Sequence, residues 1–95
     1  MTTLLIHHRV ADYDAWKQVY DGVEGMQREA GVRSHRVWRS EEDPNLVVIE
    51  HEFESGEAAN EFMERSDLRE AMGRGGVDES SIQVEQLEQT DSGRL

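Results

Sequence analysis

The stretch His35–Glu54 (HRVWRSEEDPNLVVIEHEFE) decides the fold, because it contains two strand-like segments on either side of a turn. Residues 32–40 and 46–54 alternate apolar and polar side chains, which is the pattern of half-buried strands. Between them, Pro44 restricts the backbone, and Asp43 and Asn45 can hydrogen-bond to neighbouring peptide groups. The stretch therefore predicts an antiparallel hairpin.

The register of this hairpin decides which polar side chains lie on the same face. In one register His35 and His51 share a face, while Trp38, Arg36 and Glu50 share the other. A slip of one residue would bring Trp38 and His51 together instead, because side chains alternate between faces. We favour the first register, which gathers apolar residues beside the two histidines and against the helices. These apolar residues are Val37, Val47, Ile49 and Phe53.

Helices and further strands are predicted on both sides of the hairpin. Residues 3–10 are apolar and β-branched and predict a first strand. Residues 12–30 predict one amphipathic helix, capped by Asp12 and ended by Gly31. Its apolar residues recur every three or four positions, and the bulky aromatic ones are expected to pack in the core. They are Tyr13, Trp16, Val19, Tyr20, Val23, Met26 and Ala30.

Two shorter helices and a last strand are expected after the hairpin. Ser55 is a predicted N-cap, and Asp67 with Glu70 resembles a capping box that starts another helix. Residues 82–87 alternate in the manner of a half-buried strand. We predict one domain over residues 1–89 and a flexible tail over residues 90–95.

The predicted order is β-α-β-β-α-β, which is the ferredoxin-like arrangement of the α+β class. It has a four-stranded antiparallel sheet with both helical regions on one face. The other face is bare, and such a face is usually covered by a partner, a ligand or water over polar side chains.

Composition excludes several kinds of partner and chemistry. A net charge of -11 argues against binding to nucleic acid or to anionic membranes. The absence of cysteine excludes disulfides and thiol nucleophiles. No apolar run is long enough for a membrane helix, and no signal peptide is evident, so we expect a cytoplasmic protein. The acidic, arginine-rich composition suits either a high-salt cytoplasm or a GC-rich genome, and both alternatives stay open.

Five segments resemble the antibiotic-biosynthesis-monooxygenase-type family of the dimeric α/β-barrel superfamily. They are VADYDAW (10–16), AGV (30–32), RSEEDPN (39–45), FESGEAANEF (53–62) and SDLREAMGRGGV (66–77). The resemblance implies a homodimer whose sheets pack face to face, with a ligand pocket between sheet and helices. Relatives include cofactor-free monooxygenases, haem-degrading enzymes, cyclases and isomerases. Haem degradation is disfavoured here, since the helix after the third strand lacks a histidine.

The candidate site residues follow from the strand and helix positions. His7 or His51 is the expected general base, since a partly buried imidazole can titrate near neutral pH. Arg36 can stabilise an enolate or phenolate oxygen. Trp38 and Tyr20 can provide an aromatic wall, and Glu50 lies on the same predicted face as Trp38. The four histidines show no metal-ligand spacing, so we predict no metal and no cofactor.

The alternatives for these residues are structural. Trp38 can pack at a dimer interface, and Arg36 can pair with a glutamate across the hairpin.

Two classes of function stay open. One is a cofactor-free monooxygenase, or a cyclase or isomerase, acting on an aromatic or polyketide-like molecule. The other is a dimeric ligand-binding or stress-associated module without turnover. The enzyme hypothesis requires a cavity of roughly a few hundred Å³, which is the usual size of a small-molecule site.

Overall fold

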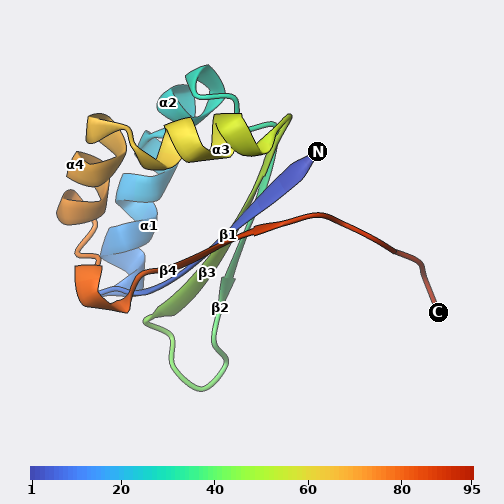
Figure 1. The fold of residues 1–95 in the computed structure, drawn as a ribbon. Coiled ribbons are helices and arrows are strands. Elements are labelled where there is room, and N and C mark those ends of the chain that lie inside the picture. Colours follow the sequence, from blue (N-terminus) through green and yellow to red (C-terminus); the bar gives the residue numbers. More distant parts are fainter.

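The computed structural model describes residues 1–95 and places all the helices on one side of a single sheet (Figure 1). The strands are antiparallel and lie in the order β2-β3-β1-β4. This confirms the predicted ferredoxin-like fold, with each helical region divided into two helices. The elements are β1 (Thr2–Arg9), α1 (Tyr13–Gly22), α2 (Glu24–Glu29), β2 (Ser34–Arg39), β3 (Leu46–Phe53), α3 (Gly56–Met63), α4 (Ser66–Arg74), the 3₁₀ helix η1 (Glu79–Ser81) and β4 (Gln83–Leu87).

The predicted start signals of the first and third helices are confirmed. The Asp12 carboxylate accepts a 3.0 Å hydrogen bond from the Ala15 backbone N–H. The Ser55 hydroxyl accepts one of 3.2 Å from the Ala58 backbone N–H. Each bond satisfies a backbone donor that has no partner within the first turn of its helix.

Two helix predictions were wrong in detail. The predicted single helix over residues 12–30 is broken at Val23, whose φ of -105° and ψ of 14° lie outside the helical range. The predicted capping box at Asp67 does not form, because α4 already begins at Ser66. The Asp67 carboxylate instead accepts hydrogen bonds of 3.0 and 2.9 Å from the Arg65 guanidinium.

The hairpin has the register that the sequence analysis favoured. His35 lies opposite His51, Arg36 opposite Glu50, and Val37 opposite Ile49. His35 and His51 therefore lie on the helix-covered face of the sheet, and Arg36 and Glu50 lie on the open face.

The core fills the space between the sheet and the helices. Alternate residues of β1 and β3 point into it, as expected for strands with one covered face. The buried apolar residues are Leu4, Ile6, Val10, Trp16, Tyr20, Val47, Ile49, Phe53, Ala59, Phe62 and Ala71. Three polar side chains are buried among them: His8, Gln27 and His51.

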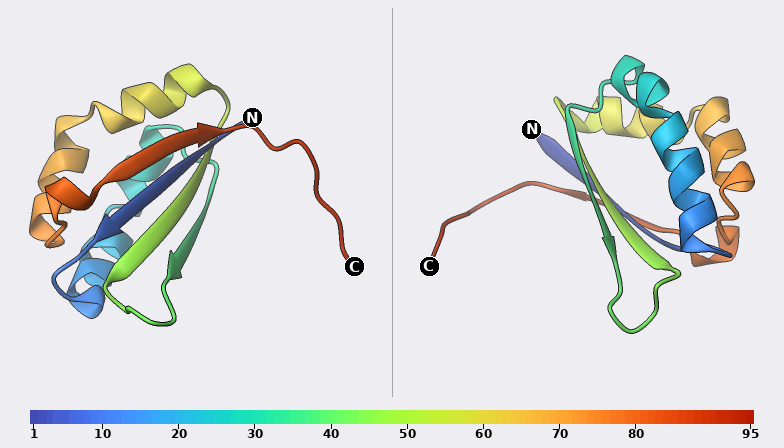
Figure 2. Two further views of the ribbon diagram at one scale, coloured as in Figure 1. Left: turned by 60° about the horizontal axis from the view of Figure 1, so that its bottom comes forward. Right: turned by 180° about the vertical axis from the view of Figure 1, so that it is seen from behind.

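No helix covers the second face of the sheet, which the two views of Figure 2 show from different sides. The last strand was predicted to be half-buried, yet all residues of β4 are exposed. The reason is that β4 is an edge strand whose only strand neighbour is β1. Residues 88–95 extend away from this edge (Figure 2). None of the helices combines the length and the apolar character that a membrane span requires.

Candidate active site

A small cavity lies between the covered face of the sheet and the helices. Its volume is about 40 Å³, and apolar side chains from both strands and helices form most of its wall. The polar exceptions are two histidines and Gln27. The lining residues are Ile6, His8, Trp16, Val19, Tyr20, Val23, Gln27, Ile49, His51, Phe62, Leu68, Ala71 and Met72.

One histidine of the cavity belongs to a chain of hydrogen-bonding groups that reaches the surface. The hydroxyl of Tyr20 lies 3.0 Å from Nε2 of His51 and 2.9 Å from Nδ1 of His35. His51 is only 2% exposed and Tyr20 8%, whereas His35 lies at the surface. The hairpin register brings the two histidines side by side, and α1 places the tyrosine hydroxyl between them.

Burial determines the protonation states of His51 and Tyr20 in this hydrogen-bonded path. Burial, with a smaller contribution from charge on the neighbouring His35, lowers the pKa of His51 from 6.5 to about 4. Burial also raises the pKa of Tyr20 to about 12; the nearby Gln27 amide opposes this effect and the Asp21 carboxylate adds to it. At neutral pH, His51 is therefore a neutral imidazole and Tyr20 a neutral phenol.

His8 is the second histidine of the cavity. It is 1% exposed and packs edge-on against the Trp16 ring at a centroid distance of 5.7 Å. Burial lowers the pKa of His8 too, with its own backbone carbonyl acting in the opposite direction. His8 and His51 lie toward opposite ends of the cavity, because the Ile6–Ile49 pair separates their positions along β1 and β3. The separation along the strands is about 13 Å, at roughly 3.3 Å per residue.

Both histidines carry a nitrogen without a hydrogen-bond partner. Nδ1 of His8 and Nδ1 of His51 are the buried side-chain nitrogen and oxygen atoms left unpaired in this protein. A buried polar atom without a partner costs roughly 1–3 kcal/mol, so such atoms are rare unless a ligand or water uses them. Each of these nitrogens is therefore available for a further hydrogen bond, and both histidines line the cavity.

The cavity is smaller than the enzyme hypothesis required. About 40 Å³ accommodates one water molecule, whereas a site for a flat aromatic molecule typically measures at least about 300 Å³. The helix α4 has one buried residue, Ala71, just as α2 has one, Gln27. Leu68 and Met72, which also line the cavity from α4, are half-buried. An outward shift of α4 would therefore enlarge the cavity.

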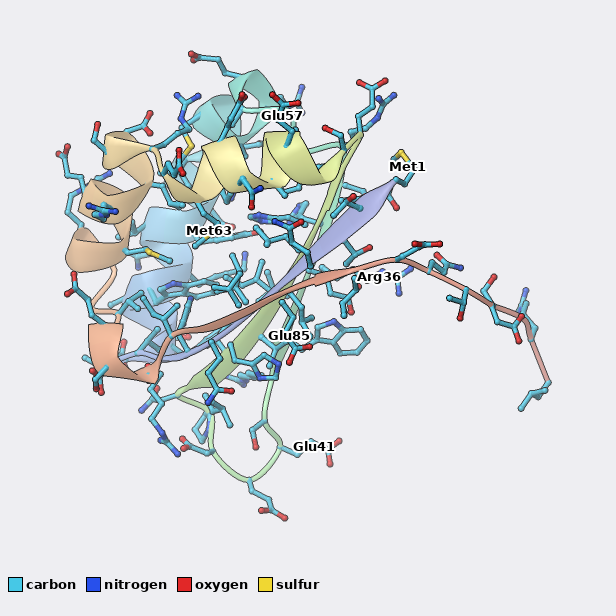
Figure 3. The ribbon with its side chains drawn as sticks, viewed as in Figure 1. Met1, Arg36, Glu41, Glu57, Met63 and Glu85 are labelled. Atoms are coloured by element: carbon cyan, nitrogen blue, oxygen red, sulfur yellow. The ribbon has the colours of Figure 1, made fainter.

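The remaining predicted site residues lie on the open face of the sheet. Arg36 is one of them, and Figure 3 shows it on the side of the sheet away from the helices. Nε1 of Trp38 donates a 3.0 Å hydrogen bond to Glu50, and the Trp38 ring is 52% exposed. His7 lies in the same row of the sheet as Trp38, because both pair with Val48.

The six predicted site residues are thus divided between the two faces. Tyr20 and His51 meet at the cavity, while His7, Trp38, Arg36 and Glu50 gather on the open face. The two proposed bases, His7 and His51, cannot act on one small ligand from opposite faces of the sheet.

The site prediction left out two polar residues of the cavity, Gln27 and His8. Gln27 lies on α2, which follows the unpredicted helix break at Val23. His8 could have been recognised from strand alternation, because it shares a face with Leu4 and Ile6.

A surface pocket on the open face is larger but of a different character. It has a volume of about 270 Å³ and no apolar residue in its wall. It is lined by Thr3, Ser34, His35, Arg36, Glu50, Glu52, Gln89 and Ser92. This pocket does not suit an aromatic ligand, which would need apolar walls. No group of three or more His, Asp or Glu side chains is placed to hold a metal ion.

Solved structures with the same fold come from several bacteria. A Bordetella bronchiseptica protein assigned as an antibiotic biosynthesis monooxygenase superposes with a TM-score of 0.80 at 15% identity, over 94% of this chain and 96% of that chain. SnoaB of Streptomyces nogalater, a cofactor-independent oxygenase, has a TM-score of 0.69 at 12% identity, over 99% of this chain and 95% of its own. Rv0793 of Mycobacterium tuberculosis has a TM-score of 0.68 at 17% identity, over 99% of this chain and all of its own.

At these identities the likeness shows the fold alone, and no curated protein sequence matches the chain significantly. The family is shown by a different comparison. Residues 11–74, which make up more than half of the chain, match the family model described as Antibiotic biosynthesis monooxygenase. This match agrees with the resemblance noted in the sequence and with the observed strand order. The chain belongs to the antibiotic biosynthesis monooxygenase family.

Proposed function

We propose that this protein is a cofactor-free oxygenase that removes a proton from a small aromatic molecule in the cavity between sheet and helices. His51 is the proposed base. The observation that carries this proposal is a neutral, 2% exposed imidazole whose Nδ1 has no partner, in the wall of a mostly apolar cavity. An apolar wall suits a flat ring, and the free nitrogen can take its proton.

Deprotonation is the step that cofactor-free oxygenation requires. The resulting carbanion or phenolate must itself give electrons to O₂, since no flavin or metal does so. A ring CH₂ that is oxidised in this way becomes a carbonyl; one oxygen atom of O₂ enters the carbonyl and the other leaves as water. The relatedness in fold to SnoaB, a cofactor-independent oxygenase, supports this reaction class. Ligand entry requires the cavity to widen, and we place this widening at α4, whose lining residues Leu68 and Met72 are half-buried.

Anthrone is a suitable probe, because it is a flat tricycle with an acidic CH₂ that O₂ converts to anthraquinone and water. Oxygen uptake and anthraquinone absorbance are measured with wild-type protein and two variants. We expect His51→Phe to lose turnover and His7→Gln, a matched histidine substitution on the open face, to retain it. Equal turnover in wild-type and His51→Phe proteins would overturn the proposal. So would tight binding of anthrone without turnover, which is the outcome expected of a ligand-binding module.

We further propose that the open face pairs with a second copy of the chain. Support comes from the absence of any covering element and from large exposed side chains there, Trp38 at 52% and Leu87 at 41%. Trp38, Arg36 and Glu50 would then lie between the two sheets. Light scattering should show a dimer for the wild-type protein and a monomer for Trp38→Glu. The control is Arg69→Glu, a charge change on exposed α4 that should remain dimeric. A wild-type monomer at micromolar concentration contradicts this assignment.

A further inference from the structure

We propose that Tyr20 and His35 form a proton relay that carries protons between buried His51 and solvent. The proposal deepens the proposed function, on which its catalytic meaning rests. The relay itself can nevertheless be measured without any substrate. Tyr20 and His35 are positioning residues in this scheme, because both act through His51 and neither contacts a reacting atom.

The geometry provides a continuous path of hydrogen-bonding groups. Two contacts of 3.0 and 2.9 Å link His51 Nε2, the Tyr20 hydroxyl and His35 Nδ1. Both distances are within the range of true hydrogen bonds. Exposure increases along the path, from 2% for His51 and 8% for Tyr20 to a surface position for His35. The path therefore begins in the cavity wall and ends at bulk water.

The donor and acceptor positions along the path determine the direction in which a proton can move. The Tyr20 hydroxyl has one hydrogen and lies between two ring nitrogens, so it donates to one and accepts from the other. When it donates to His35 Nδ1, it accepts from a hydrogen on His51 Nε2. In that arrangement neutral His51 has a free lone pair on Nδ1, which is the atom without a partner.

Transfer then proceeds without charging the tyrosine. A proton arrives from the ligand at Nδ1 of His51, and Nε2 of His51 passes its hydrogen to the Tyr20 oxygen. The hydroxyl hydrogen of Tyr20 moves to Nδ1 of His35, whose Nε2 hydrogen leaves to water. Each of the three side chains gains one hydrogen and loses one, so the net result is the transfer of one proton from the ligand to the solvent. The same transfers in reverse, starting from water at the exposed His35, return a proton to the cavity and restore the starting tautomers of both histidines.

The surroundings favour departure of the proton from His51. The groups packed against the inner end are aromatic: Phe53 and Phe62 lie with ring centroids 6.3 and 5.3 Å from that of His51. Burial among such groups disfavours the imidazolium, and so does charge on His35. A proton on His51 is therefore less stable than one released to water at neutral pH.

The outer end of the relay is surrounded by charges of both signs. From the helices, Asp21, Glu24 and Arg28 line surface pockets that His35 shares. Arg33, Arg36, Glu50 and Glu52 line such pockets from the sheet and its approach. Lys17 lies 6.0 Å from the centre of the Tyr20 ring. This end is exposed to bulk water and can exchange protons with it, whereas His51 at the cavity end is buried away from solvent.

Nitrogen-15 NMR of the histidine rings tests the relay in the full chain without ligand. Solvent exchange of the His51 Nε2 hydrogen is compared in the wild type and in Tyr20→Phe, which keeps the packed ring and removes the hydroxyl. We expect exchange to slow by about tenfold or more in Tyr20→Phe, equivalent to about 1.4 kcal/mol of barrier. His35→Gln, a surface change that keeps a polar side chain but cannot accept a proton, should have the same effect. Tyr13→Phe removes another hydroxyl from the same helix and should leave exchange unchanged.

The outcomes separate this inference from the proposed oxygenase activity. Exchange that is unchanged in both Tyr20→Phe and His35→Gln overturns the relay, since protons would then reach His51 by opening of the cavity. If anthrone turnover still depends on His51 in that case, the proposed function stands without the relay. Slower exchange in both variants supports the relay even where the wild-type protein does not oxidise anthrone.

Discussion

Replacing His51 by Phe should make the protein less sensitive to acid. Burial lowers the pKa of His51 from 6.5 to about 4, and unfolding removes this burial. Between these two values the unfolded chain binds a proton at His51 and the folded protein does not. Since the unfolded state binds more protons, the free energy of unfolding falls as the pH falls through this window.

The magnitude follows from the two pKa values. The complete effect is about 3 kcal/mol, at about 1.4 kcal/mol per pKa unit. About 2 kcal/mol of it develops between pH 7 and pH 5, where carboxylates contribute little. The pKa of His8 is also lowered by burial and adds in the same direction, but His8 is present in both proteins and cancels in the comparison.

Urea denaturation followed by circular dichroism at pH 7, 6 and 5 measures the effect. Protein concentration must be constant, because any self-association makes stability depend on it. Wild-type protein should lose about 2 kcal/mol more between pH 7 and pH 5 than His51→Phe. His51→Leu is a second variant, and His7→Gln on the open face should retain the wild-type dependence. If His51→Phe loses as much stability as the wild type, His51 is not held neutral by burial and the reasoning is refuted.

Two further predictions concern helix ends, and urea denaturation at pH 7 tests both. Gly75→Ala should lower the free energy of unfolding by about 1–3 kcal/mol, because the new Cβ would lie 3.0 Å from the Trp16 ring. Gly73→Ala in the same region meets nothing within 4 Å and should raise it by about 0.5–1 kcal/mol; an equal response of both variants contradicts the contact. Asp12→Ala should cost about 1 kcal/mol through loss of the cap on Ala15, and Asp12→Asn should cost little. Equal losses in the two Asp12 variants would show that the cap bond is not responsible.

Helix ends and helix breaks differ in how far local sequence determines them. Asp12 and Ser55 were recognised as caps, because each acts on backbone groups of its own first turn. The break at Val23 and the early start of α4 were not recognised. Both depend on how the helices fit over the sheet, and at Asp67 a bond to Arg65 competes with the cap. A capping motif predicts only which local hydrogen bonds a side chain can form with the backbone.

In the candidate site too, local sequence predicts some features and leaves others undetermined. Strand alternation was sufficient to separate Trp38 and Arg36 from His35 and His51, once the favoured register held. It was not sufficient to show that Tyr20 meets both histidines. That contact joins residues 15 and 31 positions apart and depends on the height at which α1 crosses the sheet.

The amino-acid sequence determined the order of the elements and the alternation of side chains along each strand, and it favoured one hairpin register without deciding it. These properties follow from periodicity and capping, which act between near neighbours in the chain. Only the tertiary structure decided that the histidine on the covered face is linked through a tyrosine to the surface, that the cavity is about 40 Å³, and that half-buried side chains of α4 line it. The physical reason is that volumes and long-range contacts depend on how whole elements pack, and sequence patterns carry no distances between them.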